Sequence, residues 1–176
     1  MRYFVLKQDE RIMDMPYPLG FREKIDVRHV SANLAGRVPA RTAINIRPSE
    51  FTVFPDVLCT PVLLVTQEIK NVIDAFDEYI IYRQIVYLDS ENQKAQLYFM
   101  PMLNAIDCLS EKSEYVNEFR AAFSKVVIKR APIRDKSLFQ VKNKTQRVNI
   151  IRLDLAESML ARDCKGFTLA EAALDL

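Results

Sequence analysis

Few residues of the chain have the types and spacing that enzyme chemistry requires. The chain contains one histidine, His29, three cysteines without a CxxC spacing, and three glycines. A single histidine closes most routes to a zinc site or a Ser-His-Asp arrangement, and three scattered glycines cannot form a glycine-rich phosphate loop. The sequence therefore predicts no catalytic residue, no metal site and no cofactor, and we expect a protein that is not an enzyme.

Two weaker arrangements of reactive side chains need separate consideration. Cys108 would be a candidate nucleophile only if His29 approached it in space, which nothing in the sequence predicts. Paired carboxylates, such as Glu111 with Glu114, act as acid and base only where the surroundings shift one pKa. These acids lie in polar stretches, which is typical of solvated surface, and the three thiols are interpreted as buried free cysteines.

Charge is distributed unevenly along the chain, although the formal net charge is only +2. Residues 124–152 contain nine basic residues and one acid, whereas residues 68–118 contain ten acids and four bases. A basic run of this kind can attract an anionic partner. The alternative is that the two regions lie side by side in the fold and neutralise each other.

Nucleic acid is one anionic partner to consider for the basic segment 125–152. Single-strand binding requires aromatic platforms among the cations, and Phe139 is the only aromatic residue between Lys125 and Arg147. No helix-turn-helix, RNP-like or zinc-finger pattern is present. A nucleic-acid-binding or regulatory interaction module therefore remains the alternative function, and nucleic acid is the less favoured partner.

The elements that must position these residues are short and mixed in type. Alternating or β-branched stretches predict strands over residues 2–7, 43–48 with a possible extension over 51–59, 79–88, 94–103, 124–133 and 147–154. Helical spacing of Ile69, Val72, Ile73 and Phe76 predicts a helix that begins after Thr66 as N-cap. A second helix is predicted after Asp154, with Glu157 completing a capping box. Gly166 is predicted to take the left-handed position beyond its end.

These elements indicate one folding unit. No repeat, low-complexity segment or linker divides the chain, and 176 residues suit one domain with a sizeable core. We expect a single α+β domain over residues 1–176, with a mostly antiparallel sheet flanked by two or three helices. Residues 8–42 are expected to form a long irregular segment, exposed from residue 21 onward. No apolar run approaches the roughly 20 residues of a membrane span and no signal peptide is recognisable, so we expect no membrane partner and a cytoplasmic location. Nothing in the sequence indicates the oligomeric state.

The order of three sequence motifs resembles a bacterial family first known as a domain of unknown function. The motifs are PVLLVTQEIKNVIDAF, YFMPMLNAIDCLSEKS and RLDLAESMLARDCKGF, and the resemblance covers roughly residues 57–168. The family is grouped with the immunity proteins of polymorphic toxin systems, as immunity protein eleven. The segment LNAIDCLSEKS is the most specific match, whereas residues 1–56 match less clearly.

The resemblance implies a protein that binds and neutralises a cognate toxin domain made by the same cell. Electrostatic complementarity is a common way to speed such an encounter. No family motif places the contact surface, so the contact residues are a separate hypothesis drawn from the basic run. We expect an acidic partner surface to contact Arg130, Arg134, Lys136, Lys142 and Lys144.

Overall fold

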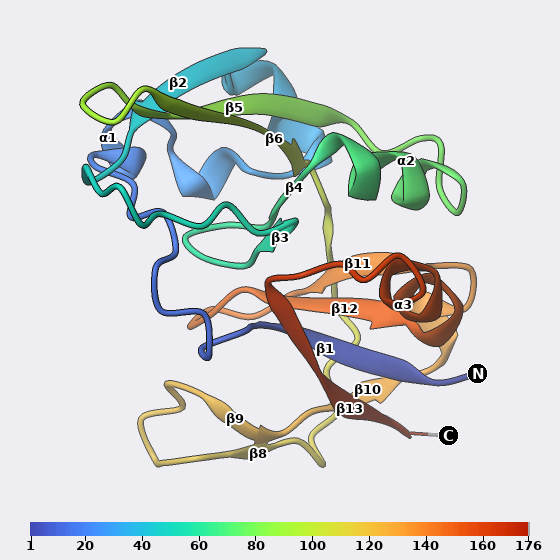
Figure 1. The fold of residues 1–176 in the computed structure, drawn as a ribbon. Helices are drawn as coiled ribbons and strands as arrows, with labels where there is room; N and C mark the ends of the chain where they lie inside the picture. The colour runs from blue at the N-terminus through green and yellow to red at the C-terminus, as the bar shows by residue number, and fades with distance from the viewer. Residues whose placement is uncertain (176) are drawn as a thin grey trace.

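The computed structural model describes residues 1–175 and shows an α+β fold with two main sheets, one above the other in Figure 1. The α+β class is therefore confirmed, but the single sheet expected from the sequence is replaced by two. The reason is that a strand's own residues report its two faces and not its pairing partner.

The six-stranded sheet places its N-terminal strand between two strands from the C-terminal part of the chain. Its order is β10 (Val127–Lys129), β13 (Phe167–Asp175), β1 (Tyr3–Gln8), β12 (Val148–Arg152), β11 (Leu138–Val141) and β7 (Ala105–Ile106). β1 pairs antiparallel with both β12 and β13, whereas the outer pairs β10 with β13 and β11 with β7 are parallel. Tyr3 and Val5 face one side and Phe4 and Leu6 the other, and both sides meet apolar side chains.

The five-stranded sheet is built around one long hairpin. Its order is β2 (Arg41–Asn45), β5 (Tyr82–Asp89), β6 (Lys94–Pro101), β4 (Leu64–Val65) and β3 (Val57–Leu58). β5 and β6 pair antiparallel over their full length, and β2 adds to β5 in parallel. A separate two-stranded hairpin, β8 (Glu114–Tyr115) with β9 (Phe123–Lys125), projects below the six-stranded sheet in Figure 1.

Two eight-residue helices join the sheets. α2 (Gln67–Asp74) belongs to the upper part of Figure 1 and α3 (Leu153–Leu160) to the lower part, and the two helices contact each other. Ile69, Val72 and Ile73 of α2 share one core cluster with Leu155 and Met159 of α3. The predicted apolar face of residues 66–76 is thus confirmed, and it packs against a second helix as well as a sheet.

The segment before β2 is ordered by buried apolar residues. It contains α1 (Phe21–Lys24) and the 3-10 helices η1 (Val27–His29) and η2 (Ala32–Arg37). Phe21, Ile25, Val30 and Val38 are each at most 5% exposed and pack under the five-stranded sheet. The expectation that residues 21–42 are exposed is therefore wrong for these positions, because their apolar residues follow neither a helical nor a strand period. No helix within residues 1–175 has the length and apolar character needed to cross a membrane.

Three local predictions need correction. β11 lies within a stretch for which the sequence predicted no strand, and only Val57 and Leu58 of the 51–59 extension form one. Arg152, not Asp154, is the N-cap of α3, because the Asp154 carboxylate accepts from the Arg152 guanidinium and its own neighbour's amide. Gly166 does have a positive φ of 110°, but it does not cap α3, which ends at Leu160. Gly166 follows the turn after α3 and directly precedes β13.

Thr66 occupies the predicted N-cap position of α2, yet its hydroxyl makes no capping bond. The hydroxyl oxygen is buried and has no hydrogen-bond partner within residues 1–175. Because an unpaired buried hydroxyl is unfavourable, we expect Thr66→Val to raise the free energy of unfolding by about 0.5–1 kcal/mol in urea denaturation. Thr66→Ala, which also loses the packed methyl group, is the comparison, and a loss of stability in Thr66→Val would show that the hydroxyl caps the helix in solution.

Candidate protein-interaction surface

The five basic residues proposed from the sequence do not lie together. Arg130 and Arg134 flank η3 (Ala131–Ile133), and Lys136 follows before β11 begins. Lys142 and Lys144 come after β11 has crossed the sheet to its opposite end. At about 3.3 Å of rise per strand residue, Lys136 and Lys142 are separated by most of the sheet's length. The structure thus divides the set into a group of three and a group of two.

Arg130 and Arg134 of the first group line an open hollow of about 740 Å³ at the end of β10 and β13, and Lys136 follows them in the chain. Lys129, Arg130, Ala131, Arg134 and Asp175 line this hollow. We call Lys129, Arg130, Arg134 and Lys136 the basic surface. All four are exposed, so their charges act on solvent and on any approaching partner.

The carboxylate in this hollow is already engaged by other side chains. Lys112 Nζ donates to Asp175 at 2.7 Å, and Ser110 Oγ donates at 2.5 Å. Both contacts favour the ionised form and hold the pKa of Asp175 below its ordinary value. Tyr3 Oη donates to the Ile133 carbonyl at 3.2 Å and so fixes η3, which carries the two arginines on either side. The hollow therefore presents more positive than negative charge.

Other cations of the basic run are neutralised by neighbours. Lys125 lies 3.7 Å from Glu114, and Arg152 lies 2.8 Å from Asp154. Glu114 belongs to the acidic segment 68–118, so the two oppositely charged regions do meet at the β8–β9 hairpin. The uneven charge seen along the sequence is accordingly reduced in the fold, and the basic surface is the part that remains concentrated.

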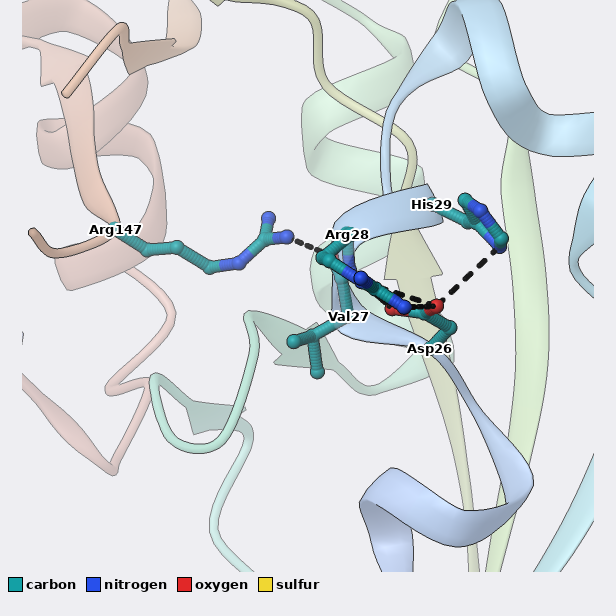
Figure 2. A network of polar contacts seen from close by, with 5 residues as sticks. All are labelled: Asp26, Val27, Arg28, His29 and Arg147. Atoms are coloured by element: carbon teal, nitrogen blue, oxygen red, sulfur yellow. Dashed lines mark hydrogen bonds and ion pairs between the residues drawn. The ribbon is translucent and has the colours of Figure 1, made fainter. Parts of the chain in front are cut away.

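Arg147 has a structural position that the sequence did not indicate. It precedes β12 and extends across to the η1 turn, as Figure 2 shows. Its guanidinium donates to the carbonyls of Val27 and Val30, and at 3.1 Å to Gln140 Oε1. Burial lowers the pKa of Arg147, and the nearby cation Arg22 lowers it further. Arg147 therefore connects the six-stranded sheet to the η1 turn of the segment before β2.

The acceptor side of this contact is held by its own ion pair. Asp26 is the N-cap of η1, and its carboxylate accepts from the Arg28 amide at 3.0 Å and the Arg28 guanidinium at 2.7 Å (Figure 2). These bonds place the pKa of Asp26 well below its ordinary value. His29 Nδ1 lies 4.0 Å from the same carboxylate. The one histidine is thus part of the η1 turn.

The reactive side chains considered from the sequence lie apart from one another. Cys108 is fully buried among Tyr3, Val5 and Ile128, and burial raises the pKa of its thiol to about 11. Burial also raises the pKa of Cys59 to about 12 and that of Cys164 to about 11. No group of three or more His, Cys, Asp or Glu side chains within residues 1–175 is arranged to hold a metal ion.

A second exposed surface was missed from the sequence. Five large apolar side chains are exposed on two neighbouring segments, and we call them the apolar patch: Met13, Tyr17, Leu19, Phe51 and Val53. The signal was the alternation of apolar residues at positions 13, 15, 17 and 19, which the interleaved prolines obscured. A period of two with an exposed apolar face is typical of an extended segment that contacts a partner.

Two comparisons with known proteins gave no match. No protein-family model matches the chain, and no curated protein matches it. The resemblance of residues 57–168 to an immunity protein family therefore stays a prediction.

Proposed function

We propose that the protein binds and neutralises a cognate protein toxin, and that the basic surface contacts an acidic region of that toxin. The observation that carries this proposal is the concentration of Lys129, Arg130 and Arg134 around one hollow whose carboxylate is already engaged. The motif order of residues 57–168 is the second support.

The geometry favours a protein as the anionic partner over a nucleic acid. Polynucleotide binding neutralises several phosphates along a continuous track of cations. Lys142 and Lys144 are separated from Arg130 and Arg134 by most of the sheet's length along β11, and Arg147 is turned inward toward the Val27 carbonyl. A compact cationic patch instead matches a local acidic surface, where complementary charge accelerates association.

The test uses a neighbouring gene that encodes a large protein as the candidate source of the toxin. Its C-terminal domain is expressed with and without the chain, and growth and co-purification are measured. We expect the domain alone to arrest growth, and the chain to restore growth and to co-purify with the domain. Failure of the chain to restore growth overturns the proposed function.

The contact surface is tested by Arg130→Glu combined with Arg134→Glu. Because charge complementarity acts mainly on the association rate, we expect toxin binding to weaken about 10- to 100-fold, with a smaller effect at high salt. The matched control is Lys142→Glu combined with Lys144→Glu, which makes the same charge change at the other end of the sheet. If both double variants lose the same amount of toxin affinity and growth rescue, net charge alone matters and the basic surface is not the contact. Salt-dependent retention on a nucleic-acid column would instead favour the alternative function.

A further inference from the structure

The apolar patch lies on a two-segment ribbon that is attached to the end of β2. Residues 13–19 run antiparallel to residues 45–53. The Leu19 amide donates to the Asn45 carbonyl, Arg47 to Tyr17 and Val53 to Asp14, each at 2.8 Å. Pro18 and Ile46 form the bridge between the two segments. The backbone of the ribbon is therefore fixed where the two segments pair.

Several large apolar side chains of the two segments are exposed to solvent, whereas Met15 packs against the core under the five-stranded sheet. Met13 is 87% exposed, Phe51 68% and Tyr17 57%, with Val53 and Leu19 nearly half exposed. Residues of neighbouring positions, such as Pro16 and Ile46, are buried. Monomeric soluble proteins rarely leave several such side chains together in solvent, because burying them against a partner is favourable.

A hollow adjoins the exposed side chains. It has a volume of about 640 Å³ and is lined by apolar residues of both the ribbon and its surroundings: Met13, Met15, Pro16, Tyr17, Phe21 and Pro61. Two charged residues of opposite sign, Arg22 and Glu23, stand at its rim and offset each other. The patch thus offers a projecting aromatic ring, Phe51, and an apolar depression that can receive one.

The first segment of the ribbon is poorly suited to pair with an additional strand. This segment carries Pro16 and Pro18, which lack the N–H group that strand pairing needs. A partner must therefore contact the side-chain face, where shape and charge select it.

Charge along the patch changes sign from one half to the other. Arg47 is exposed and lies over the Tyr17 ring, with its guanidinium carbon 4.3 Å from the ring centroid. Asp14 and Glu50 are exposed beside Val53 and Phe51, and Lys94 Nζ donates to the Glu50 carbonyl, so this half has two carboxylates and one ammonium group. A twofold axis through the patch would bring Arg47 of one copy against the acidic half of the other, twice. A surface of this kind is complementary to itself, which an isologous contact requires.

We propose that the apolar patch is the interface of a homodimer, with Phe51 of each copy seated in the apolar hollow of the other. Tyr and Arg often contribute much of the binding energy at interfaces, and Tyr17 with Arg47 forms the basic half of the patch. This association does not depend on the proposed toxin binding, because the basic surface lies at the end of β10 and β13 in the six-stranded sheet, whereas the ribbon continues from β2 of the five-stranded sheet.

Sedimentation equilibrium of the full chain from low to high micromolar concentration tests the proposal. We expect reversible dimerisation, and we expect Phe51→Glu to weaken it at least tenfold. Phe119→Glu is the matched control, since Phe119 is 87% exposed at the tip of the β8–β9 hairpin, away from the patch. A monomer at every concentration, or equal weakening by both variants, overturns the proposal.

A charge exchange distinguishes self-association from a general apolar stickiness. Arg47→Glu makes the patch acidic in both halves, and Glu50→Arg makes it more basic, so each variant alone is expected to dimerise at least several-fold more weakly. An equimolar mixture of the two restores complementarity and is expected to form heterodimers. If the mixture associates no better than either variant alone, the twofold arrangement is wrong. A native thermal transition in each variant excludes loss of folding as the cause.

Discussion

Gly166→Ala is expected to lower the free energy of unfolding by about 3 kcal/mol or more, which is a large share of the 5–15 kcal/mol of an ordinary domain. Gly166 has a φ of 110°, a conformation that side-chain-bearing residues rarely adopt. A Cβ atom there would overlap the Val57 carbonyl oxygen and the Pro55 ring. The same glycine's carbonyl accepts from the Asp9 amide at 3.0 Å and Gln8 Nε2 at 2.6 Å, so the backbone cannot shift without breaking contacts to β1.

Urea denaturation of Gly166→Ala and of Gly36→Ala measures this effect. Gly36 lies in η2, and a Cβ there would have no heavy atom within 4 Å. We therefore expect Gly36→Ala to change stability by less than about 1 kcal/mol, and in the stabilising direction, because alanine restricts the unfolded chain. Equal stability losses in the two variants would show that the stability does not depend on the backbone conformation and close packing at Gly166.

Arg147→Met is expected to lower the free energy of unfolding by about 2–3 kcal/mol. Methionine fills similar space but leaves the Val30 carbonyl without a donor, and the Val27 carbonyl keeps only the Val30 amide. Leaving a half-buried acceptor unpaired lowers the stability of the fold. Arg147→Lys is expected to recover less than half of the loss, since one ammonium cannot reproduce the planar fork of the guanidinium.

Local opening provides a second readout for Arg147. The amides of His29 and Val30 are bonded within the η1 turn, and we expect their hydrogen exchange to accelerate in Arg147→Met more than that of the sheet amides. Lys144→Met, which removes an exposed cation from the same loop, is the control and is expected to change stability by less than about 0.5 kcal/mol. Unaltered exchange in η1 would mean that Arg147 does not hold the two parts of the fold together.

Sequence analysis placed correctly the residues whose spacing indicates one buried face of one helix or hairpin. Ile69, Val72 and Ile73 repeat at the helical period and are buried on one face of α2. The β5–β6 hairpin follows from two β-branched and aromatic stretches joined by a polar turn. In each case the information lies within about a dozen residues, so local pattern is sufficient.

The candidate site was less readable because it depends on contacts between distant segments. Residues 130–144 look continuous in the sequence, but β11 carries the chain across the sheet and separates Lys142 from Arg134. Arg147 counts as one more cation in composition, yet its charge is directed at carbonyls about 120 residues earlier in the chain. The apolar patch likewise forms only when residues 13–19 meet residues 45–53.

The central place of β1 in the six-stranded sheet has a consequence for how fast the chain folds. Tyr3 pairs with Arg152 on one side and Ala172 on the other, so this strand closes loops that span nearly the whole described chain. Closing such long loops has a high entropic cost, and few local contacts form early to offset it. We therefore expect slower folding than in domains of similar size with mostly local contacts. The α2 segment and the β5–β6 hairpin, by contrast, form from neighbouring residues. We therefore expect a folding nucleus in the five-stranded sheet, with the apolar faces of β1 left uncovered until β12 and β13 join it.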